Sequence, residues 1–332
     1  MSKKVFILLL NYNSFLDTIE CIESLLKLSY ENYQIIVVDN SETLEPFQNL
    51  NNWALGSFVV GETLLEDLIF PVEEKPVDFC KISENNFLEN ELNEKIVFVK
   101  ANSNRGYAAG NNIALRYILK FGRSDSFIWI LNNDTVVDKE SLLAQVTYLS
   151  KPENYGIGIL GSKLIYYYKP LQIQAVGGKF NKMFYISTHI GEGQSISKLK
   201  SQFQDIDYVN GASMFMKLTF LKKIGLLSED FFLYYEELDW AYKANKVGLK
   251  LDWCPDSLVY HKEGASIGSS YDSNRKTFFS EVHLFKSRKI FIKKHFKLNL
   301  KFYMSSILLI INRIRKGKFK LGFELLKITF GV

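Results

Sequence analysis

Three carboxylates lie within four positions of one another, at Glu236, Glu237 and Asp239, where a helix is expected to begin. His261 follows after a segment that reads as helix, turn and strand, and Asp134 stands upstream behind two asparagines. A carboxylate can act as a general base, and an imidazole together with a second carboxylate can hold a divalent cation. If the fold brings these groups together, they indicate a metal-assisted transfer reaction.

Each of these groups also has a purely structural interpretation. Acids favour the first turn of a helix because the helix dipole is positive there. His261 could be a strand-end histidine bonded to backbone, and Asp134 could cap the end of a strand. The elements that must position these residues therefore decide between the two interpretations.

Strands and helices alternate through the first third of the sequence. Apolar runs and helical spacing predict strands at 5–10, 33–39, 96–99 and 127–131, and helices at 15–28 and 110–121. This alternation predicts an α/β fold with a doubly wound, mostly parallel sheet. Ligands bind such sheets beyond the carboxyl ends of the strands. Asn11, Asp39 and the segments 102–106 and 132–134 lie at these ends, so we expect them to converge.

The alternation is lost between residues 42 and 94, a segment rich in Glu, Asn and Leu that contains three prolines. We interpret it as an insertion with short helices or a hairpin. It could form a flap over the site, although a solvated decoration is favoured. From 155 to 208 the sequence reads as strands and loops, and a further short strand is predicted at 249–253.

Seven short motifs carry a resemblance to a known family. They occupy residues 10–13, 37–41, 104–112, 131–135, 209–213, 231–239 and 260–264. In this order and approximate spacing they resemble the family 2 glycosyltransferases, most of all the bacterial rhamnosyltransferase-like branch. The likeness covers roughly residues 4–268, interrupted by the segment 42–94. It implies a GT-A fold, a nucleotide-diphosphate-sugar donor, a divalent metal, Mn²⁺ or Mg²⁺, and inversion at the anomeric carbon.

The resemblance assigns roles to the residues of these motifs. Asp134 and His261 would hold the metal, and a histidine suits Mn²⁺ better than Mg²⁺. Glu237 stands at the position of the catalytic base, Glu236 is the rival base, and Asp239 would orient the acceptor. The donor-binding candidates are Asn11, Asn13, Asp39, Asn104, Gly106, Asn111, Asn132, Asn133 and Gly211, and the acceptor-platform candidates are Trp240 and Tyr234.

Asp39 would accept a hydrogen bond from the imide of the nucleobase, although an Asp-Asn-Ser sequence is also good turn chemistry. The small residues at 104–112 would let the backbone approach phosphate at a helix start, or would simply make a tight turn. Trp240 and Tyr234 could form a sugar platform, although residues of these types more often belong to the core.

Two departures from the family pattern keep alternatives open. Asn132 stands where the family has the first aspartate of its metal motif, and Glu237 is one methylene longer than the usual aspartate. A non-catalytic relative that binds a glycan or a partner therefore remains an alternative. A nucleotidyltransferase is another, although the N-terminal residues 11–13 lack the basic nucleotide-binding loop expected of that class.

The charge is distributed unevenly. Residues 286–332 carry thirteen Lys and Arg residues against one acid, a net charge of +12, whereas the first 285 residues have a net charge of −7. Apolar stretches separate the basic clusters, which predicts a basic amphipathic helical region at 269–332 beyond a catalytic domain at 1–268. Such helices lie on anionic membranes. A solvated helical cap or an oligomer contact is the alternative, and no nucleic-acid reader motif is present.

These features predict where the protein works and on what. Three widely spaced cysteines without a CxxC pair fit a reducing cytoplasm, and no stretch reaches the roughly 18–20 apolar residues of a membrane span. We expect a cytoplasmic protein bound peripherally to the inner face of the cell membrane. The resemblance makes dTDP-rhamnose the default donor and leaves UDP-hexoses open. The expected acceptor is a surface polysaccharide or a lipid-linked oligosaccharide.

Overall fold

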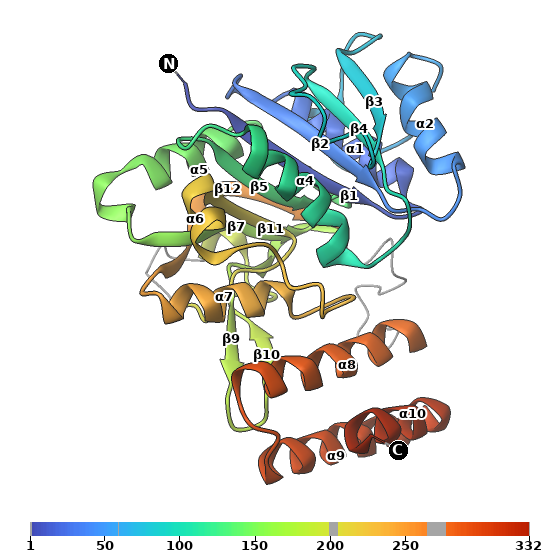
Figure 1. The fold of residues 1–332 in the computed structure, drawn as a ribbon, viewed down its shortest axis with the longest axis vertical. Helices are drawn as coiled ribbons and strands as arrows, with labels where there is room; N and C mark the ends of the chain where they lie inside the picture. Colours follow the sequence, from blue (N-terminus) through green and yellow to red (C-terminus); the bar gives the residue numbers. More distant parts are fainter. Residues whose placement is uncertain (1, 59, 199–204, 264–276, 332) are drawn as a thin grey trace.

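The computed structural model describes residues 2–58, 60–198, 205–263 and 277–331 (Figure 1). The strands of its main sheet are β1 (Val5–Asn11), β2 (Tyr33–Asp39), β3 (Phe79–Ser83), β4 (Ile96–Lys100), β5 (Phe127–Asn132), β6 (Thr135–Val137), β7 (Ile157–Tyr166), β8 (Lys169–Ala175), β11 (Ser213–Lys217) and β12 (Lys250–His261). Within the described residues they follow the order β3-β4-β2-β1-β5-β11-β7-β12-β6, with β8 paired to β7. A separate hairpin joins β9 (Gly178–Asn181) and β10 (Ile186–His189).

The N-terminal half of the main sheet is parallel, as the alternation of strands and helices predicted. Strands β3, β4, β2, β1 and β5 pair in parallel, and β2 begins and ends where the apolar run predicted. Both faces of β1, β2, β4 and β5 are covered, so these strands are buried along nearly their whole length rather than on one face. The mostly parallel α/β sheet is therefore confirmed.

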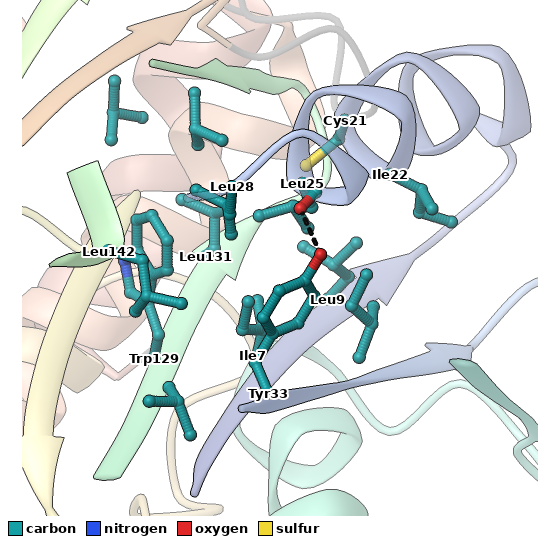
Figure 2. Packing of buried hydrophobic residues seen from close by; sticks show 14 of the residues in the cluster. Ile7, Leu9, Cys21, Ile22, Leu25, Leu28, Tyr33, Trp129, Leu131 and Leu142 are labelled. Carbon is teal, nitrogen blue, oxygen red and sulfur yellow. Dashed lines mark hydrogen bonds between the residues drawn. The ribbon is translucent and has the colours of Figure 1, made fainter. Parts of the chain in front are cut away.

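Helices cover the two faces of the sheet. They are α1 (Phe15–Leu26), α2 (Glu45–Ala54), α3 (Glu66–Ile69), α4 (Tyr107–Phe121), α5 (Ser141–Ser150), α6 (Leu218–Ile224) and α7 (Glu236–Lys246). Helices α1, α2 and α5 pack on one face, and α4, α6 and α7 pack on the other. Figure 2 shows α1 on its face, where Tyr33 donates a hydrogen bond of 2.7 Å to the carbonyl of Leu25. Each fully buried Leu or Ile of these layers contributes about 1.5–3 kcal/mol relative to exposure.

The segment 42–94 is part of the body of the protein. Short helices occur there as expected, but β3 extends the main sheet as an edge strand parallel to β4. Trp53 of α2 is fully buried and donates a hydrogen bond of 2.8 Å to Glu23 of α1. The segment is therefore not a solvated decoration, because its apolar residues complete the core against α1.

Strand β12 is much longer than the predicted strand at 249–253, because it continues to His261. Its parallel pairing with β7 shifts register between Cys254, opposite Ser162, and Leu258, opposite Lys163. The extra residues include Ser257, whose hydroxyl is fully buried with Ser162 at 2.9 Å. Pro255 and Asp256 interrupt the apolar pattern within this bulge, which explains why the strand was predicted to end early.

The C-terminal region is helical, as predicted. It forms α8 (Phe278–His295), α9 (Leu300–Arg315) and α10 (Phe319–Phe330), and Figure 1 shows α8 lying between the body and the α9–α10 pair. The buried Arg288 of α8 donates to the carbonyl of Tyr185 beside the β9–β10 hairpin and to Ser306 of α9. The predicted boundary at 268/269 lies outside the described residues. In the described part of the chain, no helix is long and apolar enough to span a bilayer.

Candidate active site

A cavity of about 650 Å³ opens beyond the carboxyl ends of the central strands. Its walls come from the loops after β1, β4 and β5, the loop before β11, the start of α7, the end of β12 and the start of α8. The predicted residues that line it are Asn104, Gly106, Asn132, Asn133, Asp134, Gly211, Tyr234, Glu236, Glu237 and His261. The convergence expected at this edge of the sheet is therefore present for residues of 102–106 and 132–134, whereas Asn11 and Asp39 do not line the cavity.

Asp134 and His261 meet at one corner of the cavity. Asp134 lies in the turn between β5 and β6, and His261 ends β12 directly opposite Thr135, the first residue of β6. This pairing brings the Nε2 atom of His261 to 3.2 Å from the Oδ1 atom of Asp134. Burial alone would lower the pKa of His261, but the Asp134 carboxylate outweighs burial, so the pKa is raised.

The surroundings of this pair suit a divalent cation. The Nδ1 atom of His261 lies 2.9 Å from Oε1 of the buried Gln174 on β8, which orients the ring so that Nε2 faces Asp134. The amide of Asn132 lies 3.4 Å from the same Nε2. The described residues contain no group of three or more His, Cys, Asp or Glu side chains placed to hold a metal. A cation here would therefore depend on phosphate oxygens and water for its remaining ligands.

Glu236 and Glu237 enter the cavity from the first turn of α7. The two residues before this helix, Tyr234 and Tyr235, both have left-handed backbone, with φ of 71° and 74°. Such a conformation costs bulky residues about 1–3 kcal/mol each and occurs where the surrounding structure enforces it. It turns the chain sharply, so that the start of α7 points its acids into the cavity.

The two glutamates differ in their surroundings. Glu237 is half-buried, and burial raises its pKa to about 7. Glu236 is 2 % exposed, and its Oε1 atom has no hydrogen-bond partner among the described residues. Burial, with a further contribution from the charge of Glu237, raises the pKa of Glu236 well above its usual value. Glu237 is thus the more accessible of the two, whereas Glu236 is favoured in its neutral form.

Glycines let the walls approach one another. Gly106 has a φ of 92°, and a Cβ atom there would lie 2.3 Å from the carbonyl oxygen of Phe232. The next residue, Tyr107, donates its backbone N–H to the same carbonyl at 2.8 Å. Gly211 faces Glu237, whose Oε2 atom would lie 3.8 Å from an added Cβ. Only glycine at 106 fits the contact that joins the start of α4 to the loop before α7.

Four predicted donor-binding residues, Asn11, Asn13, Asp39 and Asn111, do not line the cavity. Asp39 is fully buried and accepts hydrogen bonds from Asn11 at 2.8 Å, from the hydroxyl of Ser41 at 2.6 Å and from Lys100 at 2.8 Å. Asn13 donates its backbone N–H to Ser41 at 2.9 Å. Asn111 donates to the carbonyl of Tyr107 at 3.0 Å. These bonds support the loops that carry the lining residues.

Asp239 and Trp240 point away from the cavity. The Oδ1 atom of Asp239 lies 2.7 Å from Nε2 of His295 on α8, and its Oδ2 atom lies 2.7 Å from Nζ of Lys243. Although burial opposes ionisation, these partners lower the pKa of Asp239 to about 2. Trp240 is fully buried against Phe220 and donates to a backbone carbonyl. Trp240 is therefore a core residue instead of the expected sugar platform, and Asp239 joins α7 to α8.

Sequence reasoning missed several aromatic residues of the site. Tyr12, Tyr107, Tyr208, Phe232 and Phe279 line the cavity. Phe279 lies at the start of α8, so the C-terminal region supplies part of the wall. No sequence signal places that helix against the loop before α7. None of the described residues between 42 and 94 lines the cavity, so a flap formed by them is not observed.

Comparison with known proteins relates the chain to named transferases. No family model matches it. It is 25 % identical over 170 residues to the low-salt glycan biosynthesis hexosyltransferase Agl10 of Haloferax volcanii, covering 51 % of this chain and 53 % of the relative. It is 22 % identical over 186 residues to the rhamnosyltransferase WbbL of Escherichia coli, covering 53 % of this chain and 65 % of the relative. The match thus spans less than two thirds of either relative.

Solved structures show the same fold. The mannosyltransferase PcManGT from Pyrobaculum calidifontis, solved in complex with GDP-Man and Mn²⁺, gives a TM-score of 0.51 at 12 % identity, over 98 % of this chain and 73 % of that one. GalNAc-T7, solved with UDP, GalNAc and Mn²⁺, gives 0.56 at 14 % identity, over 88 % of this chain and 48 % of that one. Both likenesses agree with the GT-A fold expected from the sequence. The sequence relatives support a family 2-like glycosyltransferase, and the shared fold agrees with that reading.

Proposed function

We propose that the protein transfers a sugar from a nucleotide-diphosphate donor to an acceptor hydroxyl group, with inversion at the anomeric carbon. One observation supports this above all. A single cavity holds a metal-capable pair, Asp134 and His261, and a carboxylate, Glu237, whose pKa is raised to about 7. The names of the sequence relatives and the nucleotides in the solved neighbours agree with such a donor.

The reaction needs a base on the acceptor side. In the proposed step Glu237 takes the proton of the acceptor hydroxyl, and the oxygen attacks the anomeric carbon as the bond to the diphosphate breaks. The proton ends on Glu237, and the diphosphate leaves with the bonding electrons. Glu236 is less suited to this task, because its buried carboxyl is favoured as the neutral acid.

The leaving diphosphate needs its charge neutralised. Asp134 and His261 would hold Mn²⁺ or Mg²⁺, which supplies Lewis-acid stabilisation of that charge when bound. Gln174 keeps the imidazole of His261 aimed at the site. The side-chain amide of Asn133 donates a hydrogen bond of 2.9 Å to the hydroxyl of Thr18 on α1, and this bond fixes the turn that carries Asp134. Preorganisation of this kind lowers the cost of assembling the site during the reaction.

The donor and acceptor follow from the relatives and from the basic C-terminal region. The likeness to a rhamnosyltransferase supports dTDP-rhamnose as donor, with UDP-hexoses as the alternative. The acceptor we propose is a growing surface polysaccharide or a lipid-linked oligosaccharide. The net charge of +12 at residues 286–332 supports a cytoplasmic protein held peripherally at the inner face of the cell membrane. Phe232, Phe279 and Tyr234 form the apolar wall offered to the acceptor.

Nucleotide binding tests this proposal directly. Thermal unfolding is followed with dTDP, UDP, GDP and CDP, each with and without Mn²⁺. We expect one of them to raise the melting temperature in a metal-dependent manner, since binding to the native state stabilises it. Turnover with the corresponding nucleotide sugar should then be lost in Glu237→Gln. Absence of stabilisation by every nucleotide would refute the transferase proposal, and metal-dependent binding without turnover would indicate a non-catalytic relative.

A further inference from the structure

Helices α9 and α10 expose apolar side chains that the rest of the described chain does not cover. These residues, called the apolar face below, are Leu300, Met304, Ile307, Leu308 and Ile311 on α9 and Phe319, Phe323 and Phe330 on α10. Their exposed fractions run from 38 % at Ile307 to 73 % at Leu300. Most are separated by three, four or seven positions, which places them on one side of each helix.

Packing within the protein does not account for the apolar face. The inner side of α9 holds two buried serines, Ser305 and Ser306, and both accept hydrogen bonds from Arg288 of α8. Two polar positions are thus buried while five aliphatic ones face outward. Exposed apolar area forgoes about 25 cal/mol per Å² of hydrophobic stabilisation, so a cluster of this kind marks an interaction surface.

Basic residues border the apolar face. Lys301 and Arg315 flank it on α9, and Lys320 and Lys327 flank it on α10, all with exposed side chains. A second copy docked face to face would bring these cations together, which is unfavourable. An anionic lipid surface instead offers phosphates to the Lys and Arg side chains and an acyl boundary to the apolar ones.

We propose that the apolar face docks on an anionic lipid bilayer, with α9 and α10 lying in the plane of the membrane interface. The inference deepens the proposed function, on which it rests, by giving the acceptor-bearing surface a binding site on this chain. Helix α8 links the two sites, because its Phe279 lines the cavity and its Arg288 is bonded to α9. Helix α8, which lies between the body and the α9–α10 pair, therefore connects the docking surface to the cavity (Figure 1).

Vesicle co-sedimentation of the full chain tests the proposal without any turnover. Vesicles of phosphatidylcholine alone are compared with vesicles of phosphatidylcholine and phosphatidylglycerol. We expect binding to the second only, weakened by high salt because the screening length shortens. The double variant Leu308→Gln and Ile311→Gln should bind at least about tenfold more weakly, since it removes two inserted side chains. Glutamine retains good helix propensity, so the fold should persist.

A matched control replaces two exposed apolar residues of the body, Leu64→Gln and Leu171→Gln, and should bind as the unaltered chain does. The variant Lys320→Gln and Lys327→Gln tests the charges independently, with a loss of roughly tenfold or more. Equal binding by the α9 variant and its control would overturn the proposal, as would equal binding to neutral vesicles. Light scattering without lipid that shows a dimer, lost in the α9 variant, would instead assign the face to self-association. Because nucleotide binding is measured separately, failure of membrane docking and failure of the proposed transferase activity are distinguishable.

Discussion

The Nε2 atom of His261 lies 3.2 Å from the Oδ1 atom of Asp134 because the last residue of β12 pairs with the first residue of β6. Two strands far apart in the sequence thus deliver an imidazole and a carboxylate to one point. A third residue, Gln174 of β8, contacts the Nδ1 atom of His261 and so fixes the orientation of the imidazole ring. Backbone pairing next to the β5–β6 turn therefore sets the position of both groups.

Replacing Gln174 with alanine should weaken metal binding without removing a metal-facing group. Loss of such a supporting hydrogen bond typically costs about 10–100-fold in metal affinity. The measurement is a Mn²⁺ titration of the nucleotide-dependent melting temperature. His261→Ala should abolish the metal dependence, and Gln172→Ala, on the same strand, should leave it unchanged. A Gln174→Ala protein with unaltered Mn²⁺ affinity would contradict the role assigned to this residue.

The pH dependence of turnover should report Glu237. A base must be ionised to accept a proton, and burial raises the pKa of Glu237 to about 7. The rate should therefore rise as the pH increases through about 7 and level off above it. Glu237→Gln should reduce kcat by about 100-fold or more. Glu236→Gln should keep the acidic limb of the pH profile, and its disappearance in that variant would identify Glu236 as the base instead.

Asp239 should matter for stability more than for chemistry. Asp239→Asn breaks a buried pair with His295 and should lower the free energy of unfolding by about 3 kcal/mol. The lowered folded-state pKa of about 2 means that the carboxylate stabilises the fold fully above the unfolded value of about 3.9. That contribution is lost as the pH falls through about 2. Urea unfolding against pH measures both effects, and a variant of unchanged stability but altered acceptor KM would favour an acceptor-orienting role.

Phe279 should affect the acceptor and not the donor. Its ring lies 6.1 Å from that of Phe232 across the cavity wall and is half exposed, so Phe279→Ala should raise the acceptor KM several-fold. Stacking of a ligand on an aromatic ring contributes about 0.5–1.5 kcal/mol. Metal-dependent nucleotide binding should be unchanged. Phe278→Ala is the matched control, because Phe278 is 52 % exposed and does not line the cavity.

The sequence predicted those parts of the fold that local patterns determine. The run at 33–39 is apolar at nearly every position, and β2 occupies those residues. Asn132 and Asp134 were predicted at a strand end, where the parallel topology gathers side chains, and both line the cavity. His261, which lies well beyond the strand predicted at 249–253, was indicated by the family resemblance instead. The ends of parallel strands share one edge, so topology alone carries this information.

Contacts over long sequence separations could not be predicted in the same way. Asp239 pairs with a histidine 56 positions away. No sequence pattern near Asp239 indicates that α8 packs against this side of α7. Tryptophan is a residue type that can form a sugar platform, but the ring of Trp240 packs on Phe220 of α6. Helical periodicity tells which residues share a face, but only the packing of other elements decides whether that face is core or cavity.

The bulge in β12 makes the orientation of His261 depend on whether residues are gained or lost there in odd or even numbers. Side chains alternate between the two faces of a strand, so an odd change in residue number reverses the face of everything beyond it. Removing one residue between Cys254 and Leu258 would turn His261 away from Asp134 unless the unpaired residues of the bulge rearranged to take up the change. Removing two would preserve the orientation. Insertions and deletions here are thus constrained by their count, even where the identity of each residue is free to change.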